Sequence, residues 1–235
     1  WGVIHNGILL NDKAIEAADN LLKNSKKIVF LSNAPRYPEK VREFLKKLKM
    51  EEKYLQNIVT SGEAAMHAIN QNRFGKLFYH LGPSRDSSIF EKVKDNKTEI
   101  DDCDFILCTG LFDENEDNMD YYKNFLLKHV SKKLVCTNPD LIVHRGNKEE
   151  YCAGYIAKIF EELGGKVTYY GKPHKEIYQI CFKPNEKVLA IGDNLRTDIK
   201  GANNLNKDCL FISNGVHRNE FNSNLELQKL LNKYK

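Results

Sequence analysis

The sequence predicts an α/β fold built on a doubly wound parallel sheet. Short apolar runs of strand length alternate with longer segments whose apolar residues recur at helical spacing. Two of the runs, residues 27–31 and 188–191, lead into small polar or acidic residues, as buried parallel strands do where they reach a ligand crevice. No internal repeat or low-complexity linker divides the 235 residues, so a second domain would have to be inserted into the first.

The first third of the chain alternates regularly between helix and strand. Ile15, Ala18 and Leu22 give residues 11–23 one apolar helical face. A buried strand is then expected over residues 27–31, a helix over 38–48, a short strand at 58–60 and a helix from Ser61 onward.

The same alternation continues to the C-terminus. Strands are expected over residues 76–80, 104–108, 133–137, 167–170, 188–191 and 208–212, and helices over residues 88–93, 119–129, 151–163, 173–182, 197–204 and 225–234. The acidic run at residues 113–118 is interpreted as a solvated loop that caps the following helix, with a cation site as the alternative.

Composition is that of a soluble globular protein and excludes several functions. Hydrophobic residues make up 41% of the chain and charged residues 29%. The net charge of +4 is spread along the chain without a sustained basic tract, so no nucleic acid polymer is expected as a partner. No apolar run approaches the roughly 18 residues of a membrane span, and no secretory signal is visible, so a cytoplasmic protein is expected.

The six cysteines are expected to be buried free thiols. They form no CxxC pair, have no histidine at metal spacing, and lie mostly within apolar runs. This pattern fits a reducing compartment better than a disulfide framework or a zinc site.

The strongest chemical signal lies in residues 188–199. The apolar run ends at Gly192 and Asp193, and Asp198 follows at the start of a helical segment. Two acids beside a glycine at a strand end suit a hard cation such as Mg²⁺, which takes a few carboxylates together with substrate phosphate oxygens. Taken alone, the stretch fits a strand-to-helix turn equally well.

Two other strand ends carry groups that complement a phosphate. Ser32 and Asn33 follow the strand at residues 27–31, and Lys172 follows the strand at residues 167–170. Because the carboxyl edges of parallel strands converge, these groups are expected in one crevice with the two acids. The alternatives are a turn role for Ser32 and a surface position for Lys172, although a cation at a helix start opposes the helix dipole.

Four motifs, taken in order, resemble those of the haloacid dehalogenase superfamily, class IIA, which includes NagD-like and p-nitrophenyl-phosphatase-like sugar phosphatases. The second, third and fourth family motifs are matched by Phe30-Leu31-Ser32-Asn33, Gly171-Lys172-Pro173 and Gly192-Asp193-Asn194-Leu195-Arg196-Thr197-Asp198-Ile199. The landmarks of the class IIA cap are matched by Thr137-Asn138-Pro139-Asp140 and Cys152-Ala153-Gly154. The resemblance covers essentially the whole chain and implies a Rossmann-like core with an inserted cap.

The first family motif is matched only in part. Its second aspartate aligns with Trp1, which puts the nucleophilic aspartate two residues before the first residue of the sequence; an upstream continuation that includes a strand is expected. The chain thus resembles a subgroup with Trp in place of the second aspartate. An indole cannot transfer a proton where the family's general acid/base normally lies, so slow turnover or a preference for good leaving groups is expected. His5 is a neighbouring candidate proton donor, with an ordinary loop histidine as the alternative.

The resemblance implies a role for each candidate residue. Mg²⁺ would be held by the upstream aspartate, by the main-chain carbonyl of Trp1 and by Asp193, while Asp198 orients Lys172 or a metal-bound water. The catalytic set would be Lys172, Asp193 and Asp198, and the phosphoryl oxygens would be bound by Ser32, Asn33, Lys172 and Asn194. Asn138 and Asp140 are interpreted as shaping a cap turn, with substrate contact as the alternative, and Arg196 as forming structural ion pairs.

The expected architecture is a hydrolase core of residues 1–60 and 168–235 with an inserted α/β cap of residues 61–167. The leading prediction is a Mg²⁺-dependent phosphatase that hydrolyses a small phosphomonoester, a sugar phosphate or a nucleotide, through an aspartyl-phosphate intermediate. The alternative, motivated by Trp1, is a weak or inactive family member that binds a phosphorylated metabolite as a sensor or partner module. Carbon–halogen hydrolysis is disfavoured because Asp193 and Asp198 are retained for a metal. The expected partner is a small phosphorylated metabolite and not a membrane, and a homodimer is left open.

Overall fold

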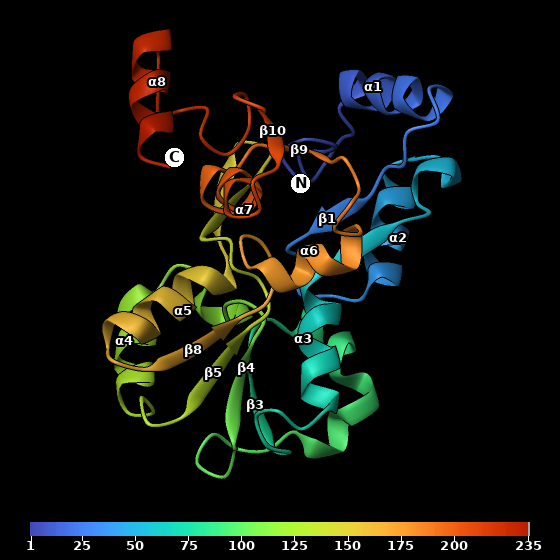
Figure 1. Ribbon diagram of the computed structural model, residues 1–235. Helices are drawn as coiled ribbons and strands as arrows, with labels where there is room; N and C mark the ends of the chain where they lie inside the picture. The colour runs from blue at the N-terminus through green and yellow to red at the C-terminus, as the bar shows by residue number, and fades with distance from the viewer. Residues whose placement is uncertain (235) are drawn as a thin grey trace.

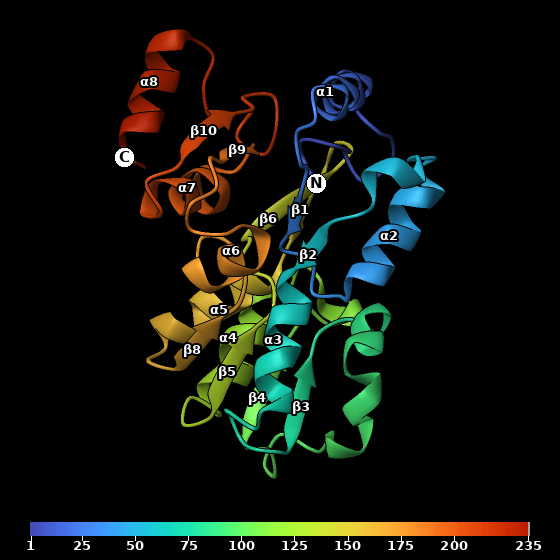
Figure 2. The same cartoon turned by 45° about the vertical axis from the view of Figure 1, so that its right-hand side comes forward.

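The computed structural model describes residues 1–234 and shows two α/β lobes, one above the other in Figures 1 and 2. The core lobe contains β1 (Phe30–Ser32), β2 (Ile58–Thr60), β9 (Leu189–Gly192) and β10 (Asp208–Phe211). The cap lobe contains β3 (Phe78–Leu81), β4 (Phe105–Cys108), β5 (Lys133–Cys136) and β8 (Lys166–Tyr169). All strand pairs within these two groups are parallel, which confirms the predicted fold class.

The core strands form two parallel pairs, β1–β2 and β9–β10, within the part of the chain that the structure describes. The core helices are α1 (Asp12–Lys23), α2 (Pro38–Lys47), α6 (Lys175–Cys181), α7 (Lys200–Asn204) and α8 (Asn224–Asn232). In the register of the two pairs, Ser32 lies opposite Thr60 and Gly192 opposite Phe211. The polar segments that follow β1 and β9 therefore leave the core strands at their carboxyl ends.

The cap is a four-stranded sheet in the order β3-β4-β5-β8, covered on both faces. The helices α4 (Met119–Leu127) and α5 (Ala153–Glu162) cover one face, while α3 (Ser61–Asn70) and the 3₁₀ segment η2 (Ser84–Asn96) cover the other (Figure 1). Alternate residues of β4 point to opposite faces, so that Ile106 packs toward α4 and α5 while Phe105 packs toward α3. Burial on both faces of the sheet explains why all four residues of β4 are apolar.

The chain enters the cap directly from the core. Residue Thr60 ends β2 and caps α3, because its hydroxyl accepts a hydrogen bond from the Glu63 amide at 3.2 Å. At the other end, the boundary expected at residues 167/168 falls within β8. Since β8 pairs with β5, this strand belongs to the cap sheet, and the chain returns to the core only after Tyr169.

An antiparallel hairpin between the two lobes was not predicted from the sequence. It consists of β6 (Ile142–Arg145) and β7 (Lys148–Tyr151), joined through Gly146 with φ +61°. The Gly146 amide donates to the Asn6 carbonyl at 3.0 Å, so the hairpin tip lies on the N-terminal loop of the core. The helix expected from residue 151 begins two residues later, because Tyr151 belongs to β7.

The remaining elements are short. They are the 3₁₀ turns η1 (Glu52–Tyr54) and η3 (Asp113–Asn115) and the π-helical turn η4 (Leu195–Ile199). All six cysteines are free, and all except Cys209 are buried. No helix among residues 1–234 combines the length and apolar character required to cross a membrane.

Candidate active site

Segments from both lobes meet at the carboxyl ends of β1, β5, β8 and β9 (Figure 2). Asn33 follows β1, and its side chain makes two hydrogen bonds to the backbone of Lys172, which follows β8. Its Oδ1 accepts from the Lys172 amide at 2.8 Å, and its Nδ2 donates to the Lys172 carbonyl at 3.2 Å. Two segments 139 positions apart are thereby fixed in register.

Glycine is required beside this junction. Gly171 has φ +119°, and a Cβ there would meet Asn33 Oδ1 at 2.6 Å. The glycine of the Gly-Lys-Pro motif therefore allows the close approach of the two segments.

Lys172 forms a buried ion pair with Asp198. Its Nζ lies 2.7 Å from Asp198 Oδ1, and the two side chains are only 15% and 12% exposed. Burial alone would lower the pKa of Lys172, but Asp198 and Asp140 outweigh this effect and raise it, so the ammonium group stays charged. The second oxygen of Asp198 accepts from the Asn194 amide at 3.1 Å, so both carboxylate oxygens have partners.

Asp193 lies immediately after β9 with only 6% of its surface exposed. Its Oδ2 accepts from the Val216 amide at 2.8 Å. Gly2 and Gly215 pack so closely on this carboxylate that a Cβ on either would overlap it. Burial, together with the negative charge of Asp198, raises the pKa of Asp193.

Of the four carboxylate oxygens of Asp193 and Asp198, Asp193 Oδ1 is the one that the described residues leave available to bind a cation. Among residues 1–234, no hydrogen-bond donor reaches Asp193 Oδ1, whereas both oxygens of Asp198 are engaged. The same residues contain no group of three His, Cys, Asp or Glu side chains placed to hold a metal ion. The donor set thus fits Mg²⁺ held by few protein groups, and it does not fit a metal enclosed by side chains.

Asp140 lies in the site, although the sequence indicated mainly a cap turn. The turn is present, because Asn138 Oδ1 accepts from the Asp140 amide at 3.1 Å. The Asp140 carboxylate also accepts from Asn194 Nδ2 at 3.2 Å, which joins the cap to the segment after β9. Burial raises the pKa of Asp140 to about 6. Its position at the carboxyl end of a parallel strand was the sequence signal for this placement.

Trp1 contacts the β6–β7 hairpin. Its indole Nε1 donates to the His144 carbonyl at 2.7 Å, and its ring stacks on Phe44 with centroids 6.3 Å apart. The guanidinium of Arg145 lies 5.4 Å from the centre of the indole. The indole therefore joins the N-terminal loop to the hairpin and has no group that exchanges a proton at neutral pH.

His5 is unsuited to act as a proton donor at neutral pH. Burial lowers its pKa to about 3, so the ring is neutral at physiological pH. Its Nδ1 accepts from the Gly7 amide at 3.1 Å, which is a structural turn contact.

The remaining candidates make local contacts at the crevice edge. Ser32 Oγ accepts from the Ala34 amide at 3.2 Å, and Asn194 Oδ1 accepts from the Arg196 amide at 2.9 Å. Arg196 lies 3.7 Å from Glu220, which agrees with the expected structural ion pair.

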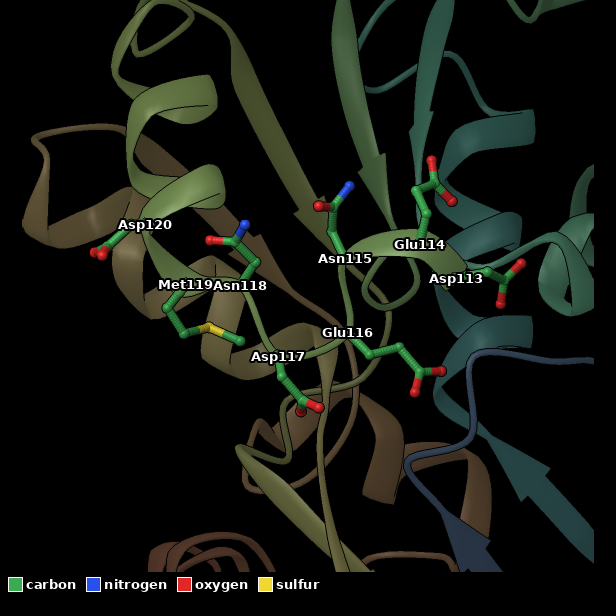
Figure 3. A pocket seen from close by; sticks show the side chains of 8 residues that line it. All are labelled: Asp113, Glu114, Asn115, Glu116, Asp117, Asn118, Met119 and Asp120. Carbon is green, nitrogen blue, oxygen red and sulfur yellow. The ribbon is translucent and has the colours of Figure 1, made fainter.

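The acidic loop on the cap lines a shallow, open surface hollow (Figure 3). Its carboxylates point in different directions and do not converge on one position. Asp113 accepts from the Ser84 amide at 2.9 Å, and Asn118 caps α4 by accepting from the Tyr121 amide at 3.0 Å. These contacts favour the interpretation as a capping loop over a cation site.

Two family models match the chain. One, described as haloacid dehalogenase-like hydrolase, matches residues 1–94, and the other, described as HAD-hydrolase-like, matches residues 169–229. Between them the two matches include Trp1, Ser32, Asn33, Lys172, Asp193, Asn194 and Asp198.

Solved structures and one curated protein are also similar. A hydrolase of the haloacid dehalogenase-like family from Brucella suis 1330 is 30% identical, with a TM-score of 0.86 over 94% of this chain and 85% of that one. The p-nitrophenyl phosphatase from Archaeoglobus fulgidus is 17% identical, with a TM-score of 0.71 over 100% of this chain and 89% of that one. A cardiolipin synthase (CMP-forming) / mitochondrial hydrolase fusion protein from Schizosaccharomyces pombe is 33% identical over 78 residues, which span 26% of this chain and only 13% of that protein.

Proposed function

The chain belongs to the haloacid dehalogenase-like hydrolase family, and on that premise we propose that it is a class IIA member and a Mg²⁺-dependent phosphatase of small phosphomonoesters. The observation that carries the proposal is the buried Lys172–Asp198 pair, 2.7 Å apart, beside the half-satisfied carboxylate of Asp193. A buried ammonium group near a carboxylate that can bind a cation suits a phosphoryl group, whose transfer gains most from electrostatic stabilisation.

In this proposal Asp193 and the main-chain carbonyl of Trp1 hold the metal ion. The Gly2 backbone packs directly on Asp193, which supports a role for the adjacent Trp1 carbonyl. The bound ion would neutralise negative charge on the phosphoryl group and orient it. Asp198 has no free oxygen, so its role is to orient Lys172.

The phosphoryl oxygens are assigned to Lys172, Ser32, Asn33 and Asn194, which lie at or just after the carboxyl ends of β8, β1 and β9. By alignment with the first family motif, the nucleophile is an aspartate two positions before Trp1. Its carboxylate would attack phosphorus, break the P–O bond to the alcohol, which leaves, and form an aspartyl-phosphate. Water would then hydrolyse this intermediate to inorganic phosphate and the free aspartate, which divides one difficult step into two easier ones. The cap, resting on the core through Asp140 and the hairpin, would shield the reaction from solvent and select the leaving group.

The substrate class proposed is a sugar phosphate or a nucleotide, both of which are alkyl esters whose alkoxide leaving group benefits from protonation. Trp1 supplies no proton, and His5 is neutral and engaged in a turn. General acid catalysis contributes roughly 10²–10⁴-fold, so turnover of alkyl phosphates is expected to be slow.

A second candidate is a catalytically weak or inactive protein that binds a phosphorylated metabolite as a sensor. The indole of Trp1 favours it, since the hydrogen bond to His144 gives this residue a structural contact in the place of an acid. The charged site of Lys172 and Asp193 would then serve binding alone.

The deciding experiment assays the full-length protein, including the position two residues before Trp1, against a panel of phosphomonoesters with and without Mg²⁺. The phosphatase proposal predicts turnover that depends on Mg²⁺ and is lost in the Asp193→Asn variant. Absent or metal-independent turnover, with binding of a phosphorylated ligand intact, would leave the sensor as the better proposal.

A further inference from the structure

The segment that follows Asp193 begins with three consecutive backbone amides, each bound by a side chain. The Asn194 amide donates to Asp198 Oδ2 at 3.1 Å, and the Arg196 amide donates to Asn194 Oδ1 at 2.9 Å. The amide between them, that of Leu195, donates to His217 Nε2 at 3.0 Å. Amides at the start of a helical turn have no intrahelical acceptor, so these side chains complete the turn.

His217 differs from the other two acceptors because it comes from a distant segment. It lies 22 positions beyond Leu195, in the loop after β10, and its ring is completely buried. Nothing in the motif that contains Asp193 and Asp198 indicates this contact. A buried imidazole that bonds a backbone amide beside the proposed metal carboxylate calls for a physical explanation.

The hydrogen bonds determine which ring nitrogen carries the proton. A backbone amide can only donate, so Nε2 of His217 must be the acceptor and the proton of the neutral ring lies on Nδ1. Nδ1 is 2.7 Å from Glu220 Oε1, and it donates to that carboxylate. Glu220 is in turn 3.7 Å from Arg196. The carboxylate thus selects the tautomer that can accept from Leu195.

Two neighbouring residues of the loop after β10, Val216 and His217, bind the residues on either side of Asn194. The Val216 amide donates to Asp193 Oδ2 at 2.8 Å, while the ring of His217 holds Leu195. Gly215 packs against the Asp193 side chain with no room for a Cβ. A shift of the His217 ring would therefore move both the Asp193 carboxylate and the Asn194 amide group that reaches Asp140.

We propose that the Glu220–His217 pair is a positioning device for the Asp193 segment. It fixes the Leu195 amide, so that Asp193 presents its free Oδ1 and Asn194 presents its Nδ2 to the crevice. Its effect on metal binding rests on the proposed function, whereas its effect on the order of residues 193–196 does not. His217 itself makes no contact with reacting atoms in this assignment.

Three variants of the full-length protein test the device. His217→Leu removes both ring hydrogen bonds, whereas His217→Gln retains a carbonyl acceptor for Leu195 and an N–H donor for Glu220. Glu220→Ala removes the group that selects the tautomer, together with its ion pair to Arg196, at a side chain that is 37% exposed. The matched control is His80→Leu, because His80 is also buried and hydrogen-bonded, but to Thr109 in the cap.

Two measurements are made on each variant. Hydrogen exchange followed by mass spectrometry reports the protection of the peptide that spans residues 193–199, and calorimetric titration with Mg²⁺ alone reports metal affinity. His217→Leu is expected to lose protection in that peptide and to bind Mg²⁺ roughly 10–100-fold more weakly, as when a partner of a ligating group is removed. Glu220→Ala should change both in the same direction, His217→Gln should restore both, and His80→Leu should change neither.

The outcomes separate this inference from the proposed function. Unchanged protection of residues 193–199 in His217→Leu, or a folded His217→Gln that behaves as His217→Leu does, would overturn the positioning role. Should the wild-type protein bind no Mg²⁺, the metal-dependent function fails, and the exchange data alone still decide whether His217 orders the segment.

Discussion

Replacement of Trp1 by aspartate is expected to convert the full-length protein into a faster phosphatase for esters with poor leaving groups. The aspartate would restore a carboxyl where the family's general acid normally lies. A positioned general acid contributes roughly 10²–10⁴-fold, so kcat for alkyl phosphates should rise by about that factor. Esters that release a weakly basic nitrophenolate need no protonation, and their kcat should change little.

The structure sets the cost of this change to stability. Trp1 is 39% exposed, and its Nε1 bonds to the His144 carbonyl at 2.7 Å. Burial of about 60% of a side chain that covers roughly 200 Å², at about 25 cal/mol per Å², stabilises the fold by about 3 kcal/mol. Loss of the hydrogen bond adds about 1 kcal/mol. The total is below the roughly 5–15 kcal/mol by which domains are stable, so the variant should fold at low temperature.

The assay compares kcat across alkyl and aryl phosphates of graded leaving-group basicity at saturating Mg²⁺. Trp1→Phe is the matched control, because it keeps the aromatic packing on Phe44 and loses only the hydrogen bond. A steep dependence on leaving-group basicity is expected for the wild type and Trp1→Phe, and a shallow one for Trp1→Asp. If the wild type already shows a shallow dependence, another group supplies the proton and the reasoning about Trp1 is refuted.

Three further predictions concern charged and buried groups. Asp193→Asn should abolish Mg²⁺-dependent turnover and leave the circular dichroism spectrum unchanged. The midpoint of urea unfolding should be at least as high as in the wild type, because the substitution removes a buried charge that Asp198 repels; a lower midpoint would contradict this. Lys172→Met should lower the free energy of unfolding by roughly 3–5 kcal/mol, because it leaves the buried Asp198 carboxylate unpaired, and Lys172→Met combined with Asp198→Asn should recover part of the loss. Burial lowers the pKa of His80 from 6.5 to about 4, so its contribution to stability is present above pH 6.5 and is lost as the pH falls toward 4. Between pH 7 and pH 5, the free energy of unfolding measured with urea should therefore fall by about 2 kcal/mol less in His80→Gln than in the wild type. Equal decreases in the two proteins would rule out this titration.

The parallel fold and the principal site residues could be predicted because both depend on local patterns. The carboxyl end of a parallel strand is marked by the polar residues that follow it, as at Ser32, Lys172 and Asp193. The expected burial of these strands is wrong for β9, where Leu189 and Ile191 are 57% and 42% exposed. The pairing of β8 with β5 could not be read in this way, because a strand pattern does not say which of two sheets the strand joins. The cap boundary was therefore expected two residues too early.

Contacts between segments that are distant in the sequence could not be predicted. The hairpin carried one signal, the two-residue Gly146-Asn147 turn, but β7 is Lys148-Glu149-Glu150-Tyr151 and lacks the apolar alternation of a strand. His217 carried none, since a histidine in a loop is usually exposed and its partner lies 22 positions away. Such residues are identified only when the fold shows which buried amide they complete.

Trp1 links the N-terminal loop of the core to the β6–β7 hairpin. Three core groups bond to two hairpin residues, His144 and Gly146: Trp1 to the His144 carbonyl at 2.7 Å, Asn6 to the Gly146 amide at 3.0 Å, and Arg218 to the Gly146 carbonyl at 3.3 Å. An aspartate side chain carries no N–H donor, so it could not make the first of these bonds. The indole thus holds the hairpin against the core. Under the proposed alignment of Trp1 with the first family motif, a position that would otherwise transfer a proton fixes the cap. We expect the protein to discriminate among phosphate esters by the reactivity of the leaving group and by how well the ester fits under the hairpin. Comparison of the Trp1→Asp and Trp1→Phe variants measures these two effects separately.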